Sequence, residues 1–211
     1  MKIFIIGGSG RVGRALSQEL VSEGHVVYAG ARDISKVIDD PNVIPVYLDL
    51  HATVETISDA FNDAEIVYFT AGSNGSDLFQ TEAYGAVKAM QAAEMKGIKR
   101  FILLSGFFAT RPERWDDPEI LGMKNYYIAK FFADNWLMTN TKLDYTILQP
   151  SRLIESPKTT QVTFSVSDLG ENSIGDVAEV LAKIPLFENT QNTIIRMASG
   201  RQTIDDCLAE V

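Results

Sequence analysis

Short apolar runs alternate with amphipathic segments along the whole chain. The first run, Ile3 to Ile6, is an unbroken set of β-branched and aromatic residues, which suits a strand covered on both faces. Similar runs predict strands at His25–Ala31, Val43–Leu48, Glu65–Thr70, Phe101–Leu104, Tyr145–Leu148 and Asn192–Met197. Apolar residues at helical spacing predict helices at Arg11–Glu23, Thr53–Phe61, Asp77–Lys96, Lys124–Thr139, Ile174–Lys183 and Thr203–Val211, with a helical or turn segment at Ser35–Asp39. This alternation predicts an α/β fold with a doubly wound parallel sheet, in one domain over residues 1–211.

Two stretches do not fit this alternation. The connection over residues 105–122 is long, and such connections are uncommon unless they line a site. We expect Gln149 and Pro150 to end the sixth strand, after which the pattern is irregular apart from a short alternating stretch at Gln161–Val166. The substrate side is therefore expected mainly in residues 105–122 and 150–173, and the residues after Pro150 are expected to form a small C-terminal appendage.

Glycines follow the first apolar run at once. Gly7, Gly10 and Gly13 give the spacing G-x-x-G-x-x-G, and Gly8 with the last two also satisfies G-x-G-x-x-G. Such glycines allow a sharp turn, a close approach of backbone N–H groups to a pyrophosphate, and packing of a helix on a strand. The positive end of the following helix points at the same turn. We expect a dinucleotide site here, with a purely structural strand-to-helix turn as the alternative; the candidate residues are Gly7, Gly10, Arg11, Val12 and Gly13.

The residue after the second predicted strand bears on the choice of cofactor. Arg32 stands where the adenosine ribose of a bound dinucleotide is expected. An acidic residue there would accept hydrogen bonds from the 2′-hydroxyl, whereas an arginine accommodates a 2′-phosphate. Arg11 and Arg14 add positive charge in the same region. We therefore expect a Rossmann-type site that prefers NADP(H) over NAD(H), with a degenerate Rossmann scaffold as the alternative.

The ends of the third and fourth predicted strands supply further candidates for cofactor binding. Asp49 and Leu50 border the expected adenine position, where the Asp49 carboxylate can accept a hydrogen bond from the exocyclic amine. Asp49 can equally cap the helix that follows. Ala71 and Gly72 lie in a turn of small residues that lets a cofactor lie close to the sheet.

Composition narrows the classes of partner. The net charge is −9 and the lysines are dispersed, which disfavours a nucleic acid or an anionic membrane as partner. Cys207 is the single cysteine, and His25 and His51 stand without a ligand cluster, so no internal disulfide and no metal site are expected. No signal peptide or membrane span is apparent. We expect a cytoplasmic monomer or homodimer that acts on a small-molecule substrate.

The helix predicted at Lys124–Thr139 carries the residues with the clearest chemistry. Tyr126 and Lys130 lie four apart on one helical face, where the ammonium can lower the pKa of the phenol and hold the nicotinamide ribose hydroxyls. The alternative is a chance spacing within an aromatic core made by Tyr127, Phe131, Phe132 and Trp136.

Two further features lie at the same expected edge of the sheet. Phe107 and Phe108 leave the fifth strand where the nicotinamide is expected, and either offer a flat substrate an apolar surface or pack in the core. Arg152 follows Pro150 and meets either an acidic substrate or only an exposed carboxylate.

With the glycine spacing and Ser105, the pair Tyr126 and Lys130 resembles the short-chain dehydrogenase/reductase superfamily. The likeness is to its atypical NAD(P)H-binding members, the NmrA-like and flavin-reductase or biliverdin-reductase-B-like proteins, and it covers nearly the whole chain. The resemblance implies that a serine polarises a carbonyl, that Tyr126 transfers a proton, and that Lys130 tunes the tyrosine and binds ribose. It also places Pro150 beside the cofactor. Matching to the longer sugar epimerases puts the polarising hydroxyl nearer Gly106 than Ser105.

The sequence thus leads to one principal hypothesis and two alternatives. The principal hypothesis is an NAD(P)H-dependent oxidoreductase that transfers a hydride to a small flat acceptor such as a carbonyl, a quinone or a flavin. The first alternative is a non-catalytic, NmrA-like regulator whose bound NADP reports redox state. Nucleotide-sugar epimerase is less favoured, because such enzymes carry a much larger C-terminal substrate domain than the segment after Pro150 provides.

Overall fold

The centre of the molecule is built from strands whose residues are apolar on both faces. The computed structural model describes residues 1–211. Seven strands run parallel: β1 (Lys2–Ile6), β2 (Val26–Ala31), β3 (Val43–Tyr47), β4 (Ile66–Phe69), β5 (Arg100–Leu104), β6 (Asp144–Pro150) and β10 (Thr193–Ser199). Two short antiparallel strands, β8 (Gln161–Phe164) and β11 (Gln202–Thr203), complete the sheet at the β10 edge. The prediction of a mostly parallel α/β sheet is confirmed.

The order of the strands fixes where a ligand can lie. The sheet runs β11-β8-β10-β6-β5-β4-β1-β2-β3, so β1 has β2 on one side and β4 on the other. The chain therefore reverses its direction of travel across the sheet beside β1. In open parallel sheets, ligands bind at the carboxyl ends of the strands at such a reversal. The turns after β1 and β4, at Gly7 and at Thr70 to Gly72, meet at this point.

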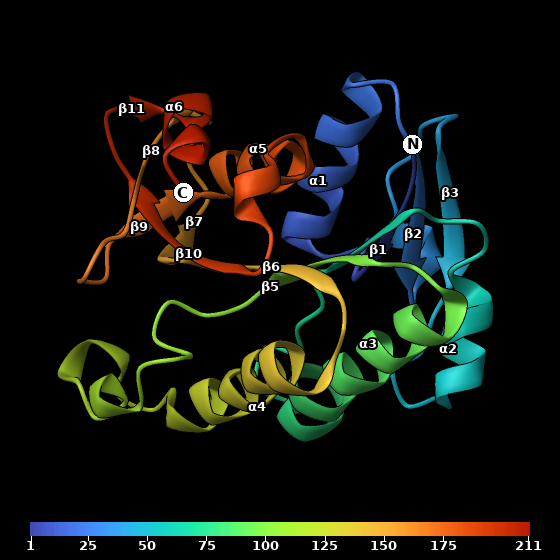
Figure 1. Ribbon diagram of the computed structural model, residues 1–211, viewed down its shortest axis with the longest axis horizontal. Helices are drawn as coiled ribbons and strands as arrows, with labels where there is room; N and C mark the ends of the chain where they lie inside the picture. Colours follow the sequence, from blue (N-terminus) through green and yellow to red (C-terminus); the bar gives the residue numbers. More distant parts are fainter.

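Helices cover both faces of the sheet, and the side chains of each strand alternate between them. Figure 1 shows α1 (Arg11–Ser22) and α5 (Ile174–Lys183) on one face and α2 (Val54–Ala60), α3 (Tyr84–Lys96) and α4 (Lys124–Asn140) on the other. Ile3 and Ile5 of β1 pack on the α1 and α5 side, whereas Phe4 and Ile6 pack on the α2 and α3 side. Both cores are therefore continuous through the central strands. No helix combines the length and the apolar character needed to cross a membrane.

The C-terminal part is more regular than the sequence suggests. Strand β6 continues through Gln149 to Pro150, which is in register with Met197 of β10, so the prediction that Gln149 and Pro150 end the strand is wrong. The irregular stretch that follows contains β8 and a separate two-stranded sheet made of β7 (Arg152–Ile154) and β9 (Glu171–Ser173). The closing helix α6 (Ile204–Ala209) begins at the N-cap residue Thr203.

The helix predicted over Asp77–Lys96 is interrupted. Residues Leu78–Ala83 form a π-helical turn, and the α-helical geometry of α3 begins only at Tyr84. Gly97 ends α3 with a left-handed backbone, φ +80°, as expected of a C-terminal glycine. Because a π-helical turn rotates the side chains that precede the regular helix, the sequence periodicity of α3 does not predict where Thr81 and Glu82 point.

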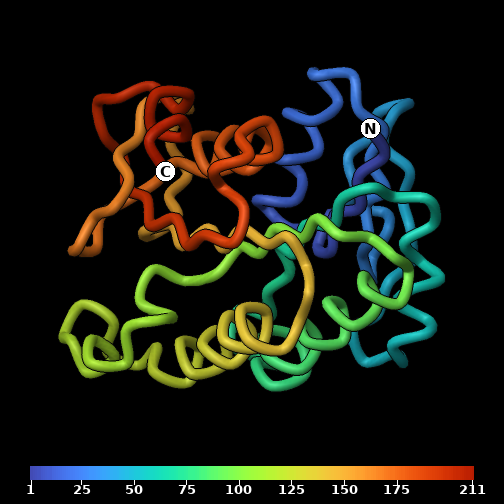
Figure 2. The backbone as a smooth tube through the Cα atoms, viewed as in Figure 1, coloured from blue at the N-terminus to red at the C-terminus, as the bar shows by residue number.

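Residues 105–123 form an ordered connection with a small core of its own. Figure 2 shows this segment reaching the same end of the molecule as the chain around residue 167. Arg111 and Arg114 each donate a hydrogen bond to the carbonyl oxygen of Ser167, both at 3.2 Å. The two stretches assigned to the substrate side therefore touch each other beyond the ends of β5 and β6.

Candidate functional site

The turn after β1 is closed by backbone hydrogen bonds. The amides of Gly7 and Gly8 both donate to the carbonyl oxygen of Gly30 at the end of β2, at 2.9 and 3.0 Å. Gly7 has φ +90°, a conformation that side chains disfavour, and a Cβ there would lie 2.7 Å from the Ala71 amide nitrogen. The turn is thus held between the ends of β2 and β4, and its path depends on glycine at position 7.

The start of α1 is open toward this turn. Gly10 is the N-cap residue and provides no side chain to bond the first amides, so the N–H groups of Arg11, Val12 and Gly13 have no intrahelical acceptor. A Cβ at Gly13 would lie 2.2 Å from the Gly7 carbonyl oxygen, whereas one at Gly10 would meet only that oxygen, at 3.2 Å. The space above Gly10 is therefore free. Unpaired amides and the positive helix end make this a fitting place for a phosphate.

A pocket extends from this turn across the ends of the neighbouring strands. Gly7, Gly10, Arg32, Asp49, Leu50, Ala71 and Gly72 all lie in its lining, as predicted for a cofactor site; Ile6, Ser9, Gly30, Ala31, Leu48, His51, Thr70 and Thr81 complete it. Arg11, Val12 and Gly13 form the adjoining first turn of α1. Lys130 and Pro150 do not line this pocket, because they lie farther along the sheet, on α4 and at the end of β6.

Arg32 is available to an anion. Its side chain is exposed and forms no ion pair, while its neighbour Asp33 is engaged by Ser35 and Lys36. Arg32 lies close enough to Asp49 for its charge to contribute to lowering the pKa of that carboxyl. A free guanidinium at the end of β2, on the rim of the pocket, suits the 2′-phosphate that we expected there.

Asp49 does not cap α2. The N-cap of α2 is Thr53, whose hydroxyl accepts from the Thr56 amide, so the helix-cap interpretation of Asp49 is wrong. Instead, Asp49 Oδ1 accepts from the His51 amide at 2.9 Å and lies 2.9 Å from His51 Nδ1. The backbone hydrogen bond, followed by that of the ring, holds the pKa of Asp49 below its ordinary value. The His51 ring also lies 3.1 Å from Asp77 Oδ2, so His51 links the segment after β3 to the loop after β4.

A second group of polar residues gathers at the ends of β5 and β6. Lys130 is 4% exposed, and its Nζ donates to the carbonyl oxygen of Leu104 at 3.0 Å. The same ammonium lies 5.8 Å from the centre of the Tyr126 ring. Burial raises the pKa of Tyr126, and the nearby groups Tyr127, Glu82 and Asp134 raise it further. The expectation that Lys130 lowers this pKa is therefore wrong, and Tyr126 is a neutral phenol at pH 7.

Ser105 belongs to a buried network rather than to an open site. Its hydroxyl donates to Asp134 Oδ2 at 2.8 Å, and the same oxygen accepts from Gln149 Nε2 at 2.9 Å. In this structure the Ser105 hydroxyl therefore donates its proton to the Asp134 carboxylate and not to a substrate position. Burial raises the pKa of Asp134 to about 6, while the two hydrogen bonds and the charge of Lys130 act in the opposite direction.

Position 106 offers no replacement for that hydroxyl. A Cβ at Gly106 would lie 3.0 Å from Cε1 of Tyr126 and 3.1 Å from Cε1 of Tyr127. Both rings would have to move to admit a serine or threonine there. Neither position 105 nor position 106 therefore presents a free hydroxyl to the tyrosine and the lysine.

The aromatic residues of the 105–123 connection serve packing. Phe107 and Phe108 are 1% and 0% exposed, and they form a small core with Ala109, Ile120 and Tyr127. The Trp115 indole donates to the carbonyl oxygen of Phe108 at 2.8 Å, which fixes the connection over this core. The core interpretation of both phenylalanines is confirmed, and their use as a stacking surface for substrate is wrong.

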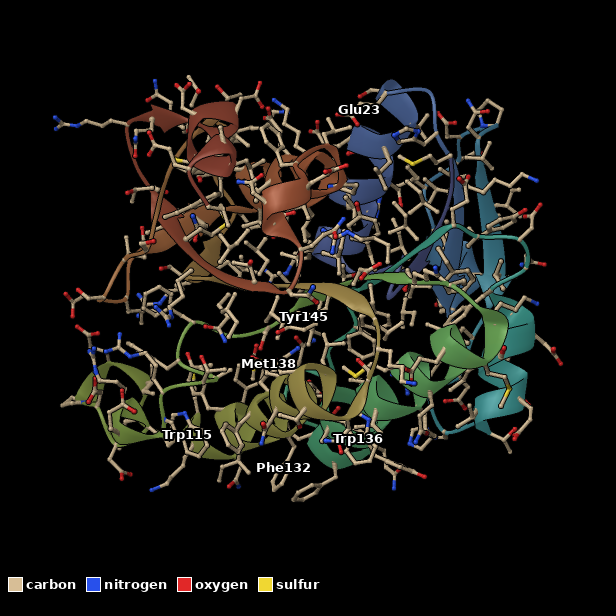
Figure 3. The ribbon with its side chains drawn as sticks, in the orientation of Figure 1. Glu23, Trp115, Phe132, Trp136, Met138 and Tyr145 are labelled. Carbon is tan, nitrogen blue, oxygen red and sulfur yellow. The ribbon has the colours of Figure 1, made fainter.

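The aromatic residues of α4 are divided between the core and the surface. Phe132 is 59% exposed and lies on the outer side of α4 in Figure 3, whereas Trp136 packs against the apolar core on the α2, α3 and α4 side of the sheet. Tyr127 is buried beneath the 105–123 connection.

Arg152 lies in β7, at the edge of the two-stranded sheet. Its guanidinium is 3.9 Å from the exposed carboxylate of Glu171. Of the two partners expected for Arg152, an exposed carboxylate is therefore the one present in this structure.

Three residues of the site were missed by sequence analysis. Asp134 repeats the spacing of Tyr126 and Lys130 by one further helical turn, a signal that was present in the sequence. Gln149 lies within β6, at the position where the sequence predicts that Gln149 and Pro150 end the strand. Glu82 lies in the π-helical turn, where no periodic pattern indicates its direction.

Comparison with known proteins agrees with this geometry. Residues 7–186 match a family of NAD(P)H-binding domains. The chain is 31% identical to the uncharacterized sugar epimerase YhfK of Bacillus subtilis, over 100% of both sequences. The crystal structure of the oxidoreductase ylbE from Lactococcus lactis is 38% identical, with a TM-score of 0.97 over 100% of this chain and 96% of that one.

A more distant structure shows the same fold with a ligand. A short-chain dehydrogenase/reductase from Veillonella parvula, solved in complex with NADP, is 19% identical, with a TM-score of 0.77 over 94% of each chain. The family match covers the glycine turn, both groups of polar residues and the helices between them. The chain therefore belongs to the NAD(P)H-binding domain family.

Proposed function

We propose that this protein is an NAD(P)H-dependent reductase that transfers a hydride to a small flat acceptor, such as a carbonyl, a quinone or a flavin. The observation that carries the proposal is the position of Tyr126 and Lys130. They lie at the carboxyl ends of β5 and β6, on the same edge of the sheet as the open glycine turn after β1. A dinucleotide lying along this edge from the pocket would end near both residues.

The residues present fit a dinucleotide at each point where it would be held. The free amides of α1 and the open space above Gly10 suit the pyrophosphate, and the unpaired Arg32 suits a 2′-phosphate, which supports a preference for NADP(H). Asp49, Leu50, Ala71 and Gly72 would line the adenosine half. Lys130 and Pro150 would lie at the nicotinamide half. The bound cofactor supplies the hydride.

Tyr126 would supply the proton. Reduction of a carbonyl consumes one proton as well as a hydride, and a neutral phenol with a raised pKa holds that proton at pH 7. Lys130 would orient the ribose hydroxyls and keep a positive charge beside the developing phenolate. Because the proton of Ser105 goes to Asp134, the phenol alone would polarise the acceptor.

Oxidation of NADPH with a panel of quinones, flavins and aldehydes tests the proposal. We expect at least one of these classes to be reduced by the wild-type protein. Tight NADPH binding without reduction of any acceptor would contradict it.

That negative outcome would favour a second function. Two observations support a non-catalytic, NADP-binding redox sensor: the Ser105 hydroxyl donates to Asp134, and Gly106 has no hydroxyl. Such a protein would bind NADP and NADPH with different affinities while turning over neither. Calorimetry with both redox forms separates the two functions when it is combined with the acceptor panel.

A further inference from the structure

Lys130 is a buried ammonium with few partners. It is 4% exposed, its one hydrogen bond goes to the neutral carbonyl of Leu104, and its nearest ring is that of Tyr126. An ammonium carries three donors, and removal from water favours the neutral amine. Burial accordingly lowers the pKa of Lys130. A lysine buried in this way stays charged more readily where carboxylates lie nearby.

The first such carboxylate is Glu82. It is 1% exposed and lies in the π-helical turn Leu78–Ala83, which packs against α4. Its Oε1 accepts from the Ser73 amide at 2.7 Å and from the Ser73 hydroxyl at 3.0 Å, and its Oε2 accepts from the same hydroxyl at 2.9 Å. Ser73 follows Gly72 of the cofactor pocket. Single π-helical turns are frequent at functional sites, and here the turn places a carboxylate beneath the pocket edge.

The second carboxylate is Asp134, one helical turn beyond Lys130. It is 0% exposed, and Oδ2 accepts from Ser105 and Gln149. Oδ1 is buried without any hydrogen-bond partner. A carboxylate oxygen left unpaired in the interior destabilises the folded state unless a charge nearby compensates it. The charges of both Glu82 and Asp134 act on Lys130 and raise its pKa against the effect of burial.

We propose that Glu82 and Asp134 are positioning residues that together hold Lys130 as an ammonium at the nicotinamide end of the site. The inference rests on the proposed function, in which Lys130 contacts the cofactor ribose. The ionisable groups around Lys130 are Asp134 and Tyr126, each one helical turn away along α4, and Glu82 on the π-helical turn that packs against α4; neither carboxylate forms a direct ion pair with Lys130. The ends of β5 and β6 contribute only neutral groups, the Leu104 carbonyl, Ser105 and Gln149.

The proposal has a consequence for the pH dependence of cofactor binding. Loss of either carboxylate charge lowers the pKa of Lys130, so the ammonium loses its proton at a lower pH. NADPH affinity should then begin to fall at a lower pH than in the wild type. One nearby charge shifts a buried pKa by about 1 unit or more, so the midpoint of the affinity loss should move down by at least roughly that much.

The experiment measures the NADPH dissociation constant from pH 6 to pH 10 for the wild type, Glu82→Gln and Asp134→Asn. Both substitutions keep the shape of the side chain, and the amide oxygen of Gln can still accept from the Ser73 amide. Asp176→Asn is the matched control, because Asp176 is equally buried but bonds Thr159 and Thr160 near α5. We expect downward-shifted midpoints in the first two variants and the wild-type midpoint in the control. Weaker binding at all pH values without a shift would indicate a structural role and overturn the proposal.

Lys130→Met provides a second test that can be used if a carboxylate variant does not fold. This variant has no group to titrate, so its binding should be weak and independent of pH. A midpoint that survives in Lys130→Met would show that another group titrates, which also overturns the proposal. Because the readout is binding, it needs no acceptor. Shifted midpoints in a protein that reduces nothing would refute the reductase function alone.

Discussion

The two halves of the site are built in different ways. The phosphate half, after β1, is made of backbone: amides of Gly7 and Gly8 on the Gly30 carbonyl, and free amides at the start of α1. The nicotinamide half, at the ends of β5 and β6, is made of buried side chains from the π-helical turn, α4 and both strands. The first half is built around one strand-to-helix turn that lies between the ends of β2 and β4, whereas the second is assembled from side chains on several separate elements.

This difference assigns different tasks to the two halves. A backbone site carries little titratable charge, so its affinity for phosphate should vary little with pH. The other half holds two carboxylates, an ammonium and a phenol within one buried cluster, and its properties depend on which of them are ionised. Substitutions in the first half should therefore change cofactor affinity at every pH, and substitutions in the second half should change turnover and the pH dependence of cofactor binding.

The largest effect is expected at Gly10. Its φ is −75°, which other residues adopt, so a side chain here does not strain the backbone. A Cβ would meet only the Gly7 carbonyl oxygen at 3.2 Å and would then fill the space for the pyrophosphate. Gly10→Val should fold and lose NADPH binding by on the order of 10³-fold or more, about 4 kcal/mol. Calorimetry and a thermal melt check both points, and wild-type affinity in a folded variant would refute the phosphate site.

Tyr126→Phe should have the next largest effect. Loss of the phenol proton should lower carbonyl reduction by roughly 10²–10⁴-fold and leave NADPH affinity nearly unchanged. Quinone and flavin reduction should fall far less, because these acceptors can take the proton from water after hydride transfer. Tyr127→Phe is the matched control: the adjacent phenol is buried against Phe108 and should be dispensable for turnover. Carbonyl turnover at the wild-type rate in Tyr126→Phe would remove this residue from the mechanism.

A smaller effect is expected at Arg32, in the phosphate half. Its guanidinium is the one side-chain charge that we assign to the 2′-phosphate, and a charge-assisted contact of this kind contributes about 1.5–3 kcal/mol. NADPH should therefore bind roughly 10- to 150-fold more tightly than NADH, and Arg32→Ala should bring the two affinities together. Arg14→Ala removes an exposed charge from α1 without removing this contact, so it should leave the ratio unchanged. Equal affinities in the wild type would contradict the assignment.

The same contrast explains how much could be predicted from the sequence. The alternation of apolar runs predicted the seven parallel strands and the helices between them, because each pattern is local. Seven of the predicted cofactor residues line one pocket for the same reason: each follows the end of a strand. The short strands β7, β9 and β11 were not predicted, since each has only two or three residues and is too short to give a period-2 pattern. Strand β11 pairs at the margin of the main sheet, and β7 and β9 pair only with each other.

The nicotinamide half was harder to predict because tertiary contacts decide it. Whether Ser105 faces a substrate or a buried carboxylate depends on Asp134, which lies 29 residues away in the chain. Whether Phe107 and Phe108 stack on a ligand depends on how the 105–123 connection folds over them. The direction of Glu82 depends on a change of helical type between Leu78 and Tyr84. None of these is encoded in a short periodic pattern.

The smallest predicted effect concerns the stability of this buried network. The pKa of Asp134 is raised from 3.8 to about 6 in the folded protein, so the folded state binds the proton more tightly than the unfolded chain does. The stabilising contribution of the protonated form is therefore present at about pH 4, is lost as the pH rises toward 6, and stays lost above that. Carboxyls with a lowered pKa, such as Asp49, contribute in the opposite direction. Asp134→Asn removes the titration, so the free energy of unfolding of the variant relative to wild type should rise by about 1–2 kcal/mol between pH 4.5 and pH 7.5. Urea unfolding at both pH values measures this difference, and a difference that is constant with pH would show that Asp134 titrates as in the unfolded chain.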